Sequence, residues 1–119
     1  MELRTARERA KANRIELQLH AQASARQQRE LGAFVRFCVA RLERELGPSE
    51  RWIVKIDPSS GGFRSMVAMH DGALAIESTG RGLDGPLAVW DALCRLEQAV
   101  REARAGRTLR APDERFDGA

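Results

Sequence analysis

The chain of 119 residues is 43% apolar and 31% charged, which is typical of one soluble globular domain with one core. Its apolar runs are only a few residues long and its first fourteen residues carry charge throughout. We therefore expect no transmembrane segment, no secretory signal and a cytoplasmic protein. The 20 Lys and Arg exceed the 17 Asp and Glu, and a net charge of +3 makes a polyanion a reasonable partner.

The first half of the chain contains one predicted strand and one predicted helix. Residues 1–13 are polar and rich in Ala and Arg, and we expect them to form a basic N-terminal arm. Residues 14–20 alternate between polar and apolar side chains, which predicts a strand with one buried face. Apolar residues at three- and four-residue spacing then predict a helix over about residues 25–46. Ser24 and Gln27 form its capping-box pattern, and Gly47-Pro48 is the expected stop.

The second half contains three predicted strands and a second helix. The strands are expected over residues 52–56, 63–70 and 73–78, with a loop of about six residues after the first. Asp71-Gly72 favours a type I′ turn between the last two strands, because both residues tolerate positive φ. The second helix is expected to begin after Asp84, its N-cap, and to end near Gly106, and residues 106–119 are expected to form a flexible tail.

These elements predict one α+β domain over residues 14–105. The order is β-α-β-β-β-α, and we expect a four-stranded antiparallel sheet with two helices packed on one of its faces.

The amino-acid sequence of both predicted helices resembles that of the ribosome hibernation-promoting factor family, whose members are also called ribosome-associated inhibitors. The matching parts are the helix-end phrase ARLEREL at residues 40–46, Asp84 opening the second helix, and Ala88, Ala92 and Arg95-Leu96-Glu97 within it. The resemblance covers residues 14–105. It implies a short-form stress factor that binds the small ribosomal subunit near its decoding region and blocks messenger and transfer RNA without catalysis. The chain departs from the family in having sparse arginines where the family has lysine-rich helix ends.

The residues themselves point to an RNA-binding surface on the first helix. A helical wheel places five arginines opposite the apolar stripe, and these are Arg26, Arg29, Arg36, Arg41 and Arg44. They could contact several phosphates of rRNA. The competing interpretation is an ordinary solvated face, which Glu30 and Glu43 interrupt.

Phe37 lies in the middle of the arginine face on the same wheel. An exposed ring beside guanidinium groups could stack on an unpaired base. The competing interpretation is that the N-terminal arm or a partner subunit covers the ring.

Three further arginines complete the predicted RNA-binding set. Arg81 lies in Gly80-Arg81-Gly82 at the start of the second helix, where backbone N–H groups could bind an anion, although the segment could also be a flexible loop. Arg95 and Arg101 lie on the second helix. Beside them, Leu87, Trp90 and Cys94 form an apolar strip that could contact a protein or pack on the neighbouring helix.

The sequence predicts no enzyme, no metal site and no cofactor. His20, His70, Cys38 and Cys94 lack the short spacing of zinc ligands, both thiols are expected to be reduced, and no P-loop, nucleophile elbow or paired-carboxylate motif is present. Two other functions stay open beside ribosome binding. One is a double-stranded-RNA-binding-like module. The other is a protein-interaction or oligomerisation module that uses an exposed sheet face, where Trp52, Phe63 and Met69 could lie.

Overall fold

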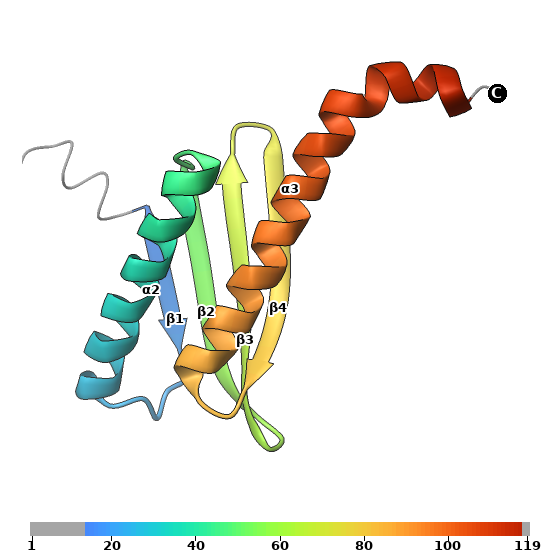
Figure 1. Cartoon of the computed structure of the whole chain (residues 1–119). Helices are drawn as coiled ribbons and strands as arrows, with labels where there is room; N and C mark the ends of the chain where they lie inside the picture. Colours follow the sequence, from blue (N-terminus) through green and yellow to red (C-terminus); the bar gives the residue numbers. More distant parts are fainter. Residues whose placement is uncertain (1–13, 118–119) are drawn as a thin grey trace, which may run out of the picture.

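The computed structural model describes the backbone of residues 14–117 and the side chains of residues 14–106, so the predicted arm at residues 1–13 lies outside the described residues. The predicted order of six elements is confirmed. They are β1 (Ile15–Leu19), α2 (Ala25–Leu46), β2 (Arg51–Ser59), β3 (Gly62–Asp71), β4 (Leu74–Gly82) and α3 (Gly85–Asp117). The strands form one sheet in the order β1-β2-β3-β4, and both helices cover the same face of it (Figure 1). The α+β class is therefore also confirmed.

The sheet is mixed rather than antiparallel, which corrects the prediction. β1 runs parallel to β2, with Ile15 opposite Trp52 and Leu19 opposite Ile56, whereas the other two strand pairs are antiparallel. The physical reason is the connection between them. A helix that crosses back over the sheet returns the chain in its original direction, so β1, α2 and β2 form a parallel βαβ unit.

The predicted loop of about six residues is wrong, because β2 and β3 extend until Ser59 pairs with Gly62. Only Ser60 and Gly61 lie between them, and Gly61 takes a φ of 78° that favours glycine. Pro58 is tolerated in β2 because β1 pairs with β2 only as far as Ile56 and leaves one edge of β2 free beyond it.

The turn between β3 and β4 is also shifted by one residue from the prediction. Asp71 pairs with Leu74, so the two central residues are Gly72 and Ala73. Gly72 has a φ of 62°, and no non-glycine residue in the described part of the chain has a positive φ. Type I′ needs a positive φ at both central positions, so this turn has the signs of type II′, with glycine first.

The helix starts agree with the sequence, and one helix end does not. The Ser24 Oγ accepts a hydrogen bond from the Gln27 N–H at 3.0 Å, and the Asp84 Oδ1 accepts one from the Leu87 N–H at 2.8 Å. α2 ends before Gly47, which has a φ of 93°. The backbone of α3 passes Gly106, its predicted end, and continues to Asp117. One internal glycine costs a helix only about 1 kcal/mol relative to alanine, which the Arg, Leu and Ala residues that follow can offset.

The core lies between the helices and the sheet. α2 and α3 contribute one buried stripe each, and β2 and β3 contribute alternate residues; the largest fully buried side chains include Trp52, Leu42, Ile56, Met69 and Leu96. Trp52 and Met69 are 1% and 0% exposed, and Phe63 packs against the core, so the predicted place of all three on an open sheet face is wrong. They occupy the other phase of the strand alternation, which faces the helices.

Candidate nucleic-acid interface

The outer surface of α2 presents a set of exposed arginines, as predicted. Arg26, Arg29, Arg36 and Arg44 are all exposed. Arg26 forms an ion pair with Glu30 at 3.0 Å, in which both side chains are mostly exposed. Arg29, Arg36 and Arg44 form no ion pair within residues 14–106. These three guanidinium groups are therefore available to an anionic partner, and we call them the α2 arginine surface.

Arg29 and Arg36 line one shallow hollow of about 480 Å³ on α2, together with Ala25 and Gln28. Gly32 lies between them along the helix. A Cβ at Gly32 would lie 3.3 Å from the Arg36 Nη1 and 3.8 Å from a methyl carbon of Leu17. The missing side chain thus lets the Arg36 guanidinium lie close against the helix, two turns beyond Arg29 and near β1.

Glu43 does not interrupt the arginine surface, contrary to the prediction. Its carboxylate accepts hydrogen bonds from Arg14 Nη1 at 2.7 Å, Arg14 Nη2 at 3.1 Å, Trp52 Nε1 at 2.9 Å and the Ser49 N–H at 3.1 Å. Burial alone would raise the pKa of Glu43. These hydrogen bonds and the charge of Arg14 outweigh burial, so the pKa lies below its ordinary value. The Glu43 carboxylate is therefore fully engaged by partners inside the fold and does not neutralise the α2 arginine surface.

Arg41 departs from the prediction because it packs between the helices. Its guanidinium lies over the Trp90 ring at 5.0 Å from the ring centroid, and its Nη1 is 3.8 Å from the Glu45 carboxylate. The side chain is only 30% exposed. Arg41 lies at the edge of the helical wheel that turns toward α3, so it joins α2 to α3 and lies outside the α2 arginine surface.

Phe37 is exposed as predicted, at 64% of its surface. It lies one turn before Arg41 on α2. Trp90 is 41% exposed, and Leu87 and Leu83 are also exposed. Trp90 thus contacts the neighbouring helix through Arg41 and still presents part of its ring to solvent, while the predicted cover of Phe37 by the N-terminal arm lies outside the described residues.

The two arginines of α3 are exposed but paired. Arg95 Nε lies 3.3 Å from Asp91 Oδ2. Arg101 bridges two carboxylates, with its Nη2 at 2.8 Å from Glu97 and 2.9 Å from Glu45 of α2. Arg101 therefore helps to fasten the helices together, and both side chains are less available than those of the α2 arginine surface.

Arg81 was predicted to lie at the start of the second helix, or in a flexible loop. Both placements are wrong, because Gly80-Arg81-Gly82 belongs to β4. A Cβ at Gly80 would lie 2.2 Å from the Ala92 backbone nitrogen, so glycine is needed for the close packing of α3 on β4. The Arg81 N–H donates to Asp91 Oδ2 at 3.0 Å, and Asp84 caps α3. The protein's own carboxylates occupy the backbone groups that were expected to bind an anion.

Within the side chains described, no group of three His, Cys, Asp or Glu residues is placed to hold a metal ion. Among the described helices, none is both long enough and apolar enough to cross a membrane. His20 lines a hollow of about 220 Å³ between the end of β1 and the start of α3, with its ring centroid 6.1 Å from that of Phe63.

Comparison with solved structures identifies the fold. The N-terminal domain of Protein Y from Thermus thermophilus superposes with a TM-score of 0.58 at 19% identity, over 73% of this chain and 93% of that domain. A ribosomal subunit interface protein from Coxiella burnetii superposes with a TM-score of 0.56 at 10% identity, over 76% and 97%. The chain shares the fold of these two proteins. The fold that the family resemblance implied is thereby supported. No family model matches the sequence, and no curated protein matches it.

Proposed function

We propose that this protein is a cytoplasmic ribosome-binding factor that contacts rRNA of the small subunit through the α2 arginine surface and inhibits translation. The observation that carries the proposal is the set formed by Arg29, Arg36 and Arg44, three exposed cations on one helix with no ion pair in the described part of the chain. The fold shared with a ribosomal subunit interface protein supports the same partner.

The contact we propose is mainly electrostatic. Each guanidinium that meets a phosphate releases condensed counterions, and three such contacts give a slope of about −2 to −3 for the logarithm of affinity against the logarithm of salt concentration. Phe37 adds a stacking contact with an unpaired base, and Arg26, Arg95 and Arg101 add weaker contacts because an anion must compete with their carboxylate partners. A folded domain seated on rRNA of the decoding region excludes messenger and transfer RNA sterically, so no catalytic step is needed.

Co-sedimentation with small ribosomal subunits at increasing salt tests the proposal. We expect binding at low salt, with a slope at least as steep as the value given above for the α2 arginine surface alone, and a lower affinity and a shallower slope for the double variant Arg29→Gln and Arg36→Gln. Arg51→Gln is the matched control, because Arg51 is also exposed but lies on β2, where it pairs with Glu16 at 2.6 Å. A folded protein that does not bind at low salt contradicts the proposal. An RNA duplex bound more tightly than the subunit would favour a double-stranded-RNA-binding-like function instead.

A protein-interaction function has one specific observation in its favour. Leu87 and Trp90 lie one turn apart on α3 and expose 51% and 41% of their surfaces. Such a strip would bind a protein by apolar contact, and added salt would not weaken that contact. Light scattering at two salt concentrations distinguishes this function, because it predicts a salt-insensitive oligomer or complex.

A further inference from the structure

The sheet face that the helices leave open carries two arginines in direct register. Arg64 of β3 and Arg81 of β4 are paired residues of the antiparallel ladder, and both are exposed. Residues paired in this way have Cβ atoms about 5 Å apart on the same face of the sheet. Neither guanidinium forms an ion pair within the described residues.

A third cation lies on the same face. Lys55 of β2 is exposed and pairs with Met66, two residues along β3 from Arg64. Asp57, which pairs with Arg64, is the nearest acidic residue in the register, and its carboxylate forms no ion pair with any of the three cations. The cluster of Lys55, Arg64 and Arg81 therefore keeps an excess of positive charge even after Asp57 is counted. We call it the sheet cation cluster.

Like charges placed opposite each other across a sheet repel, and Asp57, which pairs with Arg64 but not with Arg81, relieves this repulsion only in part. The α2 arginine surface does not share this feature, because its members are spread along a helix. An anion placed between Arg64 and Arg81 would turn the repulsion into two attractive contacts, and the planar fork of each guanidinium suits phosphate oxygens.

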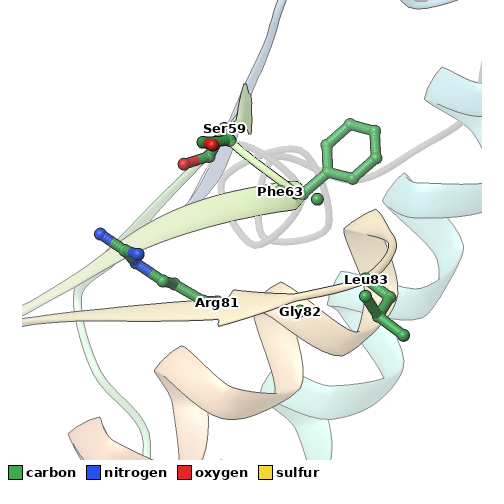
Figure 2. A pocket seen from close by; sticks show the side chains of 8 residues that line it. Ser59, Phe63, Arg81, Gly82 and Leu83 are labelled. Atoms are coloured by element: carbon green, nitrogen blue, oxygen red, sulfur yellow. The ribbon is translucent and has the colours of Figure 1, made fainter.

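A hollow of about 290 Å³ adjoins Arg81 at the β2–β3 turn (Figure 2). Ser59 and Ser60 line it, and Figure 2 shows the Arg81 side chain leaving β4 on the side of Ser59, whereas the Phe63 ring points the other way. A Cβ at Gly62 would lie 2.4 Å from the Gly82 carbonyl oxygen, so this glycine lets the turn pack against the end of β4. Hydroxyl groups are thus held beside the cluster as further donors to an anion.

We propose that the sheet cation cluster binds backbone phosphates of RNA and is a second RNA-contacting surface, on the layer opposite the α2 arginine surface. The cluster is open and largely polar, so it fits a phosphodiester chain lying across the strands better than an enclosed small molecule. This inference rests on the proposed function and deepens it, because one protein with cations on both layers joins two RNA segments.

The direct test is an NMR titration of the ¹⁵N-labelled full chain with a short oligouridine, following the Nε–Hε signals of the arginines. We expect saturable, salt-sensitive shifts at Arg64 and Arg81 and at the backbone amides of Gly61 and Gly62. Arg81→Gln should abolish the shift at Arg64 and leave the shifts at Arg29 and Arg36 intact. Absent shifts at Arg64, or the same Arg64 shift in the variant, overturn the proposal. In a parallel arm, inorganic phosphate should shift these signals more weakly than oligouridine. Equal or stronger saturable binding of inorganic phosphate overturns the RNA assignment.

Ribosome sedimentation separates this inference from the proposed function. The double variant Arg64→Gln and Arg81→Gln should bind small subunits with a slope shallower by about 1 to 2 than that of the wild type. Unchanged binding by this variant overturns the second surface and leaves the proposed function standing. If the folded wild type does not bind small subunits but oligouridine still shifts the Arg64 and Arg81 signals, the proposed function is overturned and the phosphate contact at the sheet remains.

Discussion

Arg14, which immediately precedes β1, grips Glu43 near the end of α2 with both terminal nitrogens, at 2.7 and 3.1 Å. Arg14 also donates to the Ser49 carbonyl oxygen, and the Trp52 indole donates to Glu43, so the pair joins β1, α2 and β2. Both charged side chains are mostly shielded from solvent, at 21% and 14% exposure. This network fixes the end of α2 against the parallel strand pair, and its loss should affect the whole fold.

Glu43→Gln should destabilise the protein by about 2 to 3 kcal/mol, because Arg14 keeps its charge in a partly buried position without a charged partner. Glu45→Gln is the matched control, since Glu45 is 46% exposed and should cost less than about 1 kcal/mol. Urea denaturation of both variants measures the difference. Equal losses in the two variants would show that the Arg14–Glu43 pair has no special role.

Acid should weaken the fold through the same residue. The folded pKa of Glu43 is lowered from an ordinary value of 4.5, so between these two values the unfolded chain binds more protons than the folded one. The stabilisation is therefore complete above about pH 4.5 and is lost as the pH falls through the folded pKa. Denaturation midpoints measured from pH 7 to 3 should decline below pH 4.5 in the wild type. The decline should be smaller in Glu43→Gln, and parallel curves would contradict this assignment.

The two tryptophans offer a selective signal for RNA at the helix layer. Trp52 is 1% exposed and Trp90 is 41% exposed, so an external ligand should quench only Trp90. Single-stranded RNA should quench the fluorescence of the wild type and not that of Trp90→Phe.

Phe37→Ala should weaken RNA binding by about fivefold to a hundredfold, which corresponds to the loss of one stacked base at about 1 to 3 kcal/mol. Leu87→Ala removes another exposed apolar side chain, one that cannot stack on a base, and should change the affinity far less. Equal effects of the two alanine variants would argue against stacking on Phe37.

Removing one arginine of the sheet cation cluster should stabilise the free protein. Arg81→Gln relieves the repulsion between Arg64 and Arg81, which is worth about 0.2 to 1 kcal/mol and should shrink at high salt. Thermal denaturation at low and high salt measures this gain. Arg51→Gln should do the opposite, because it removes the ion pair with Glu16. A stability loss in Arg81→Gln at low salt would mean that the two guanidinium groups do not repel each other.

The order of the elements could be predicted because each one has a strong local pattern. Alternation marks the β1 face, and Ser24 and Asp84 mark the helix starts. The direction of β1 could not be predicted this way, since alternation is the same for parallel and antiparallel strands. The signal for its direction lies in the predicted helix between β1 and β2, since a helical connection makes a parallel crossover the natural arrangement.

The candidate site could be predicted only where the helical wheel alone decides exposure. Phe37 and Arg44 lie opposite the core stripe and are exposed. Arg36, Arg41 and Glu43 lie on the flanks of the wheel, where the position of a neighbouring element decides. Glu43 pairs with Arg14, which is 29 residues away in the sequence, and no local sequence pattern indicates that contact. The pairing of Arg64 with Arg81 likewise depends on a strand register that the misplaced turn had shifted.

Two glycines with opposite surroundings give the last prediction. Gly80→Ala should severely destabilise the protein, because the new Cβ would lie 2.2 Å from the Ala92 backbone nitrogen, and only a shift of α3 away from β4 could relieve that clash. In Gly32→Ala the tightest contact of the new Cβ is with the end of the Arg36 side chain at 3.3 Å, which can move, and the Leu17 methyl lies at an ordinary 3.8 Å. Alanine is favoured over glycine inside a helix by up to about 1 kcal/mol, so Gly32→Ala should raise the melting temperature. It should also displace the Arg36 guanidinium and weaken binding to small ribosomal subunits. A more stable protein with weaker binding would separate the role of Gly32 in placing Arg36 from any role in folding, whereas unchanged binding would mean that the position of Arg36 against the helix does not matter.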